Sequence, residues 1–389
     1  MAAPRAFRSL LAGVLCGPLA AAGIRTDDDD WEAAVRRASS QILIHITDPQ
    51  LGMKNMYSAS PEDWEAERSM LAGLAEKAAE LHPSLVFVGG DMQNWWPNEK
   101  SSANRNKPRK DMPEDEFQRL LAKDLAKQQR QAVRQSLQVL EKSGIPVYYT
   151  PGNHDIGDDP DEGTLQQYTS HDGSNPGWGP LFERVREDGG VLYLQFNSQV
   201  YWSSAASLQG YREKQLEFLQ GEMRALSPDV TQLVLLTHIP PFMDAVDEEE
   251  GWANWKKVYR KEILDVLAAA KRPMLWVCGH FHANVALNST YQGLPLNIRV
   301  TSAAGTTMQW DGKDTLTPQE AEKVASKPVL AAFAQDIGFA NIASRLKAEA
   351  DRSGLRIFKI KDTGSFEDRW YTLQQLEDQK AQVSAWLGV

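Results

Sequence analysis

The stretch Pro151-Gly152-Asn153-His154-Asp155 follows the run Ile145-Pro146-Val147-Tyr148-Tyr149, which predicts a buried strand. Open α/β sheets bind their ligands at the carboxyl ends of strands. Asn153 offers a neutral oxygen to a metal ion, and His154 can hold or release a proton near neutral pH. Taken alone, a Gly-Asn pair after a strand usually forms only a turn. Whether this one belongs to a metal site therefore depends on other segments of the chain.

Four other predicted strands also end in polar residues of the kinds that bind metals. Predicted helices at 61–81, 114–142, 212–223 and 255–270 separate them, which indicates an α/β fold with two packed sheets and helices outside. Strands in register would bring their ends together along one sheet edge and form one pocket. The strands are 41–47, 85–88, 232–237 and 274–278, and the residues after them are Asp48 with Gln50, Asp91, His238, and His280 with His282.

This donor set suits two divalent ions, which need a bridging carboxylate and oxygen or nitrogen donors on either side. Asp91 is the expected bridge. Asp48, Gln50 and His282 would complete one ion's shell, and Asn153, His238 and His280 the other's. A water bridging the ions, with its pKa lowered, would attack a phosphate in line. His154 would then donate a proton to the leaving oxygen, so we expect His154 and Asp91 to be the catalytic residues.

At these residues the chain resembles the calcineurin-like metallophosphoesterase superfamily, whose pattern is Asp-x-His, Gly-Asp, Gly-Asn-His-Asp/Glu, His and Gly-His-x-His. The resemblance implies a four-layer α-β-β-α sandwich, a dinuclear metal centre and phosphoester hydrolysis. Gln50 departs from the pattern, since the superfamily usually has His there. The same Asp-Pro-Gln-x-Gly is seen in a subgroup, the calcineurin-like phosphoesterase domain-containing serine/threonine phosphatases, which the chain also resembles elsewhere between residues 42 and 373.

The resemblance therefore favours a serine/threonine phosphatase acting on a phosphoprotein or a small phosphoester. A phosphodiesterase or nucleotide phosphohydrolase is an alternative, because the same ligands serve both reactions. The second alternative is a metal-binding protein with little catalytic activity, because Gln50 stands where the superfamily usually has a histidine. The two ions could be Mn, Fe, Zn or Mg, and a harder amide oxygen favours Mn²⁺ or Mg²⁺ over Zn²⁺ at the first site.

Composition and the amino terminus bound the remaining possibilities. The 389-residue chain has a net charge of −10 and a pI near 5.3, which argues against a broad nucleic-acid surface. Residues 1–23 show the order of a secretory signal: arginines, a short apolar run, then small residues. We expect a linker at 24–40, one domain at 41–389 with an inserted helical segment at 318–351, and no later membrane span. A protein of the secretory pathway or the extracellular space is the first expectation and a cytoplasmic one the alternative. An organelle transit peptide is a rival interpretation of residues 1–23, and the oligomeric state stays open.

Several residues near these motifs have simpler interpretations. Asp155 is expected to orient a histidine of the site, while His45, His82 and the buried Cys278 are assigned to structure. The basic loop Arg105–Lys110 could steer a phosphoprotein, and the acidic run Asp247–Glu250 could help to select substrates. Four tryptophans could line the pocket rim or simply pack; they are Trp95, Trp96, Trp252 and Trp255.

Overall fold

The computed structural model describes residues 40–53, 64–94, 126–157, 159–170, 178–305, 307–309, 313–326, 347–349 and 352–389. Residues 39–389 form one compact unit. The predicted signal segment 1–23, the basic loop Arg105–Lys110, Trp95 and Trp96 lie outside the described residues, so their roles stay predictions. Among the described helices, none is both long enough and apolar enough to cross a membrane.

The first sheet has five strands in the order β14-β13-β1-β2-β3. Its parallel strands are β1 (Ser40–Ile46), β2 (Leu85–Val88) and β3 (Val147–Tyr149), and β13 (Gly354–Lys361) and β14 (Phe366–Thr372) continue it antiparallel. The three parallel strands confirm the strands predicted before Asp48, Asp91 and Asn153.

The second sheet has seven strands in the order β11-β8-β9-β7-β6-β5-β4. Strands β5 (Val191–Phe196), β6 (Gln232–Leu236), β7 (Met274–Cys278) and β9 (Leu294–Val300) run parallel. Strands β4 (Phe182–Asp188) and β8 (Asn284–Tyr291) pair antiparallel with β5 and β9, and β11 (Thr315–Leu316) pairs with β8. A separate ribbon joins β10 (Thr307–Gln309) to β12 (Lys347–Glu349).

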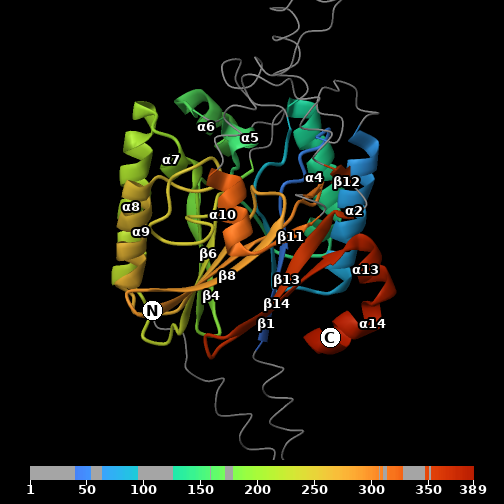
Figure 1. Cartoon of the computed structure of the whole chain (residues 1–389). Coiled ribbons are helices and arrows are strands. Elements are labelled where there is room, and N and C mark those ends of the chain that lie inside the picture. The colour runs from blue at the N-terminus through green and yellow to red at the C-terminus, as the bar shows by residue number, and fades with distance from the viewer. Residues whose placement is uncertain are drawn as a thin grey trace, which may run out of the picture. The chain divides into compact units, whose positions relative to one another are not determined.

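Helices cover the outer face of each sheet, which gives the expected α-β-β-α sandwich (Figure 1). Helices α2 (Glu65–Glu80) and α4 (Ala126–Lys142) lie on the first sheet, and α8 (Gln209–Arg224) and α9 (Lys257–Ala268) on the second. Side chains alternate along β1: Leu43 belongs to the core between the sheets, whereas Ile42 and Ile44 belong to the helix-facing core. This alternation lets each strand serve two apolar layers.

Some elements were not expected from the sequence. The polar stretch 157–180 contains helix α6 (Glu162–Thr169), which begins where the Asp161 side chain accepts the Thr164 N–H at 2.9 Å. Within the segment 318–351, expected to be an inserted helical segment, the described residues form helix α10 (Pro318–Ser326) and strand β12, and the remainder lies outside the described residues, so the insertion stays a prediction. The structure adds elements that were not predicted: β4, β8, α5 (Asn153–Ile156), α7 (Gln199–Trp202), α13 (Leu373–Asp378) and α14 (Lys380–Leu387).

A buried ion pair joins the two sheets. Arg299 of β9 donates from Nε to Asp368 Oδ2 of β14 at 2.8 Å, and Arg356 of β13 donates from Nη1 to the other oxygen of Asp368. The three side chains are only 9%, 7% and 12% exposed. One carboxylate thus compensates two guanidinium groups between the layers.

Replacing Asp368 with Asn should therefore lower the free energy of unfolding by about 3–5 kcal/mol, because two buried cations lose their anion. Urea denaturation measures this change. The control is Glu65→Gln, which removes an ion pair whose partners are 55% and 41% exposed. That change should cost about 0–1 kcal/mol. Equal decreases in the free energy of unfolding for the two variants would show that the buried ion pair stabilises the fold no more than the exposed one.

Candidate metal centre

The candidate ligands gather at the ends of strands from both sheets. Asp48 and Asp91 follow β1 and β2 of the first sheet, whereas His238 and His280 follow β6 and β7 of the second. The expectation that one sheet edge would carry all of them was wrong, because the two sheets meet here. The seven side chains are buried, with residue exposures as follows: Asp48 0%, Gln50 1%, Asp91 1%, Asn153 8%, His238 0%, His280 9% and His282 4%.

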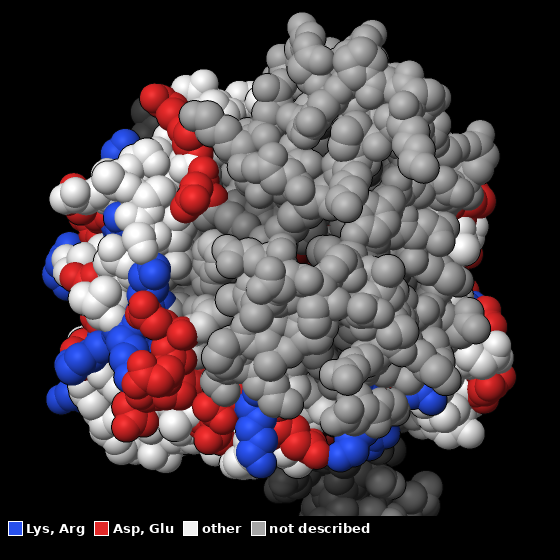
Figure 2. Space-filling model, turned by 45° about the horizontal axis from the view of Figure 1, so that its top comes forward, with Lys and Arg blue, Asp and Glu red and all other residues white. Residues whose placement is uncertain are grey.

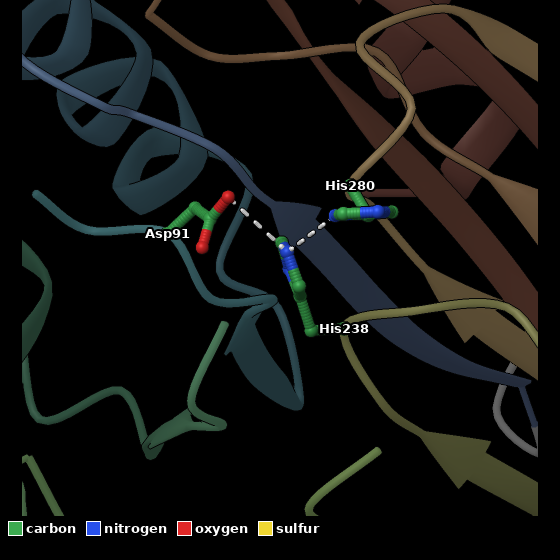
Figure 3. Close-up of side chains that lie close together, drawn as sticks. All are labelled: Asp91, His238 and His280. Carbon is green, nitrogen blue, oxygen red and sulfur yellow. Dashed lines mark hydrogen bonds and ion pairs between the residues drawn. The ribbon is translucent and has the colours of Figure 1, made fainter. Parts of the chain in front are cut away.

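Two groups of acidic and histidine side chains could each hold a metal ion, and they share Asp91. One group is Asp91, His238 and His280, and the other is Asp48, Asp91 and His282; in each, the ligand atoms lie within 4.8 Å of one another. Figure 3 shows His238 between Asp91 and His280. This division matches the one expected from the sequence, although the role of each residue as a ligand remains a prediction.

The backbone is unusual at most of these positions. Eight non-glycine residues in the described part of the chain have positive φ, and five of them are candidate ligands. Such conformations cost of order 1–3 kcal/mol each and persist where the surrounding structure enforces them, commonly at functional sites. The φ angles are 52° at Asp48, 28° at Gln50, 53° at Asp91, 70° at His280 and 56° at His282.

Asp155 is one of the groups that enforce this backbone. Its carboxylate accepts hydrogen bonds from the N–H groups of Asp91, Met92 and Gly152 at 2.7, 3.0 and 2.8 Å. Burial and the nearby Asp91 carboxylate raise the pKa of Asp155 to about 7. Through these hydrogen bonds Asp155 joins the turn that contains Asp91 to the turn that contains His154. The expectation that it orients a histidine was wrong.

The hydrogen bonds of the histidines set which ring nitrogen faces the cluster. His238 has Nδ1 2.7 Å from the Gly89 carbonyl, so it donates there, and its Nε2 lies 3.3 Å from Asp91 Oδ2. His280 has Nε2 2.8 Å from the Trp252 carbonyl and turns Nδ1 toward His238, at 3.3 Å from Nε2. Backbone carbonyls that anchor the outer nitrogen are usual for metal-binding histidines.

The charges of the cluster are strongly coupled. Burial lowers the pKa of His238, but the Asp91 and Asp48 carboxylates outweigh it and raise that pKa to about 9. Burial and the charge of His238 lower the pKa of His280 to about 4. A cation bound to His238 would have to displace its proton, as metals generally do at histidine ligands.

The residues present fit a metal ion. The Oε1 atom of Gln50 is buried and accepts no hydrogen bond from the described residues, while its Nε2 donates to Asp91 Oδ2 at 3.3 Å. A buried amide oxygen of this kind needs a donor or a cation. Together with the carboxylates of Asp48 and Asp91, it provides the hard oxygen ligands that divalent ions take up.

His154 lies beside the cluster without belonging to either group. Its backbone N–H donates to Asp91 Oδ1 at 2.8 Å, and its ring Nδ1 lies 2.8 Å from the Asn94 carbonyl, so Nδ1 donates there. Burial lowers the pKa of His154. A histidine held next to the ligands but outside both groups suits the expected proton donor.

Gln129 of α4 is a site residue that the sequence analysis missed. Fully buried, it donates from Nε2 to the Leu51 carbonyl at 2.5 Å and accepts the Asn94 N–H on Oε1 at 2.9 Å. It therefore ties the loop that carries Gln50 to the residue that orients His154. The available signal was a polar residue within the apolar face formed by Ala126, Ala132 and Val133 of this helix.

Comparison with known proteins gives the class. The model of the calcineurin-like phosphoesterase family matches residues 43–284, which is more than half of the chain. The chain belongs to the calcineurin-like phosphoesterase family. It is therefore a metal-dependent phosphoester hydrolase, and the sequence-based expectations of family, fold and reaction class are confirmed.

Curated relatives are similar over much of their length. The serine/threonine-protein phosphatase CPPED1 of Rattus norvegicus is 25% identical over 281 residues, which cover 70% of this chain and 77% of the relative. CPPED1 of Mus musculus is 30% identical over 172 residues, 44% of this chain and 50% of the relative. A solved Staphylococcus aureus structure, described as a 5'-nucleotidase in complex with alpha-ketoglutarate, aligns at 12% identity and a TM-score of 0.35, covering 70% and 51% of the two chains.

Gly152 tests how tightly the cluster is built. A Cβ at this position would lie 2.1 Å from Asp91 Oδ1 and 2.5 Å from Asp91 N. The Gly152→Ala change should push the shared carboxylate out of place and weaken Mn²⁺ binding by about 10- to 100-fold. Isothermal titration calorimetry measures this affinity. Gly221→Ala is the matched control on α8, where a Cβ meets nothing within 4 Å. Unchanged Mn²⁺ affinity in Gly152→Ala would contradict the assignment of Asp91.

Proposed function

We propose that this chain is a serine/threonine protein phosphatase that uses two divalent ions sharing Asp91. The observation that carries the proposal is the pair of buried groups with one common carboxylate, next to a histidine outside both. The name of the CPPED1 relatives supports the choice of phosphoserine and phosphothreonine as substrates. The name of these relatives also supports the expectation that the substrate is a phosphoprotein.

In this proposal each side chain has a defined task. Asp48, Gln50 and His282 would hold one ion, Asn153, His238 and His280 the other, and Asp91 both. Bound divalent ions supply positive charge for the phosphate oxygens and a water of lowered pKa.

His154 would donate a proton to the serine or threonine oxygen as its bond to phosphorus breaks. The leaving alkoxide then departs as a neutral hydroxyl. A positioned proton donor of this kind contributes about 10²- to 10⁴-fold to the rate. His154 Nδ1 donates to the Asn94 carbonyl, and in this proposal Nε2 is the nitrogen that transfers the proton.

The first measurement is metal content together with hydrolysis of p-nitrophenyl phosphate, a phosphoserine peptide and a phosphodiester. His154→Ala should keep its metal and lose about 10²-fold or more of its rate on the phosphoserine peptide. His82→Asn, at an exposed histidine after α2, is the control and should match the wild type. A wild-type protein that is fully loaded with metal but hydrolyses none of the three substrates would contradict the proposal that the chain is an enzyme. A preference for the phosphodiester would contradict the proposal that it is a phosphatase.

Gln50 leads to a prediction about metal choice. We propose Mn²⁺ or Mg²⁺ at the first site, since an amide oxygen is a harder and weaker donor than imidazole. Gln50→His should raise the affinity for Zn²⁺ by roughly tenfold or more relative to Mn²⁺. Competition with a chromogenic chelator measures both affinities. An unchanged Zn²⁺ to Mn²⁺ ratio would show that Gln50 does not bind the ion.

A further inference from the structure

A pocket of about 480 Å³ adjoins the metal-ligand cluster. Trp252 connects the two, because its carbonyl accepts the Nε2–H of His280 at 2.8 Å and the two ring centroids are 5.4 Å apart. The pocket therefore shares Trp252 with the hydrogen-bonded surroundings of the candidate ligand His280. The lining residues are Asp159, Trp202, Ser203, Ser204, Glu250, Gly251, Trp252 and Lys256.

One wall of the pocket is a loop whose shape is held by the half-buried Glu248 and the buried Asn254 and Arg260. The Glu248 carboxylate accepts three hydrogen bonds from the N–H groups of residues 243–245 at 2.7–3.1 Å. Arg260 is fully buried and donates to the carbonyls of residues 246, 248 and 255 at 2.7–3.0 Å. Asn254 Oδ1 accepts the Gly251 N–H at 2.6 Å. Glu250 and Trp252 are thus presented on a preorganised loop, which lowers the cost of binding a ligand.

The opposite wall is tied to the first. Trp202 donates from Nε1 to the Trp252 carbonyl at 2.9 Å, so this carbonyl holds both a pocket tryptophan and His280. Ser203 donates from Oγ to Asp159 Oδ1 at 2.9 Å. Asp159 follows the short helix that begins with Asn153 and His154, so this wall continues from the predicted proton donor.

The chemistry of the lining favours a cation. Asp159 and Glu250 provide two carboxylates against the single ammonium group of Lys256, whose Nζ is 3.8 Å from Glu250 Oε1. These two partners are 30% and 48% exposed, so their own attraction is weak and a guest cation can compete for the carboxylate. Trp202 and Trp252 both line the pocket, and the Trp252 ring stacks on Phe281, so Trp202 is the less occupied of the two. Indole rings are the best aromatic partners for ammonium and guanidinium groups.

Not every acidic residue of the loop contributes to the pocket. Glu248 shapes the loop, whereas Glu249 pairs with Lys257 at 2.6 Å and is 83% exposed on its side chain. Figure 2 shows that acidic and basic side chains alternate on the part of the drawn face that is not grey. Of the acidic run 247–250, Glu250 alone lines the pocket, which makes Glu249 a matched control.

We infer that this pocket binds the side chain of an arginine or lysine close to the phosphorylated residue of a protein substrate. The inference rests on the proposed phosphatase function and adds a sequence preference to it. An extended chain advances about 3.3 Å per residue, so positions −3 to +3 sample about 10 Å of chain on either side of the phosphoserine.

The experiment compares phosphoserine peptides that carry either arginine or its neutral isostere citrulline at one position from −3 to +3. At the favoured position, kcat/KM for the arginine peptide should exceed that for the citrulline peptide by about fivefold or more. In the double variant Asp159→Asn/Glu250→Gln this ratio should fall to near one. In Glu249→Gln the ratio should stay at the wild-type value. Because each ratio is taken within one variant, changes in overall activity cancel.

Each contrary outcome has its own meaning. Equal rates for arginine and citrulline peptides at every position would overturn the pocket's preference and leave the phosphatase proposal standing. A ratio that survives in the double variant would overturn the assignment to this pocket. Hydrolysis of p-nitrophenyl phosphate without hydrolysis of any peptide would overturn both the preference and the protein phosphatase.

Discussion

Two buried carboxylates, Asp48 and Asp91, face three histidines where the two sheets meet, and the surrounding structure is arranged to keep them there. Burying such charges is costly unless they are paired or bind metal. The left-handed backbone at the ligands adds local strain, and Asp155 and Gln129 are buried side chains that hold the ligand loops in place. This constraint explains why polar residues are so frequent in an otherwise apolar region.

The same arrangement of charges determines which kind of substrate the site can bind. Two carboxylates against two divalent ions would leave a positive centre that suits a phosphate dianion. The pocket next to it, beyond Trp252, has the opposite character, with an excess of carboxylate and two indole rings. In this proposal, a positive centre and a negative pocket would together be complementary to a phosphorylated residue with a basic neighbour, and Trp252 contacts both through the hydrogen bond that its carbonyl accepts from His280.

The sequence predicted the parallel strands and the polar residues at their ends, because continuous apolar runs such as Leu85–Val88 are buried on both faces. It did not predict β8, whose polar alternation resembles a surface loop, or the partition of the ligands between two sheets. The roles of Asp155 and Gln129 were also beyond it, since both act on backbone groups of distant loops. Such contacts depend on tertiary packing: the local pattern marks Gln129 only as a polar residue on the apolar face of α4 and does not show which backbone groups it binds.

The proposed mechanism depends on two divalent ions that share Asp91 at the junction of the sheets. Anomalous diffraction from crystals grown with Mn²⁺, collected on both sides of the manganese absorption edge, would locate these ions. Two peaks are expected roughly 3.5–4 Å apart, with Asp91 between them and His238 and His282 on opposite ions. A single peak, or peaks that do not touch Asp91, would contradict this mechanism.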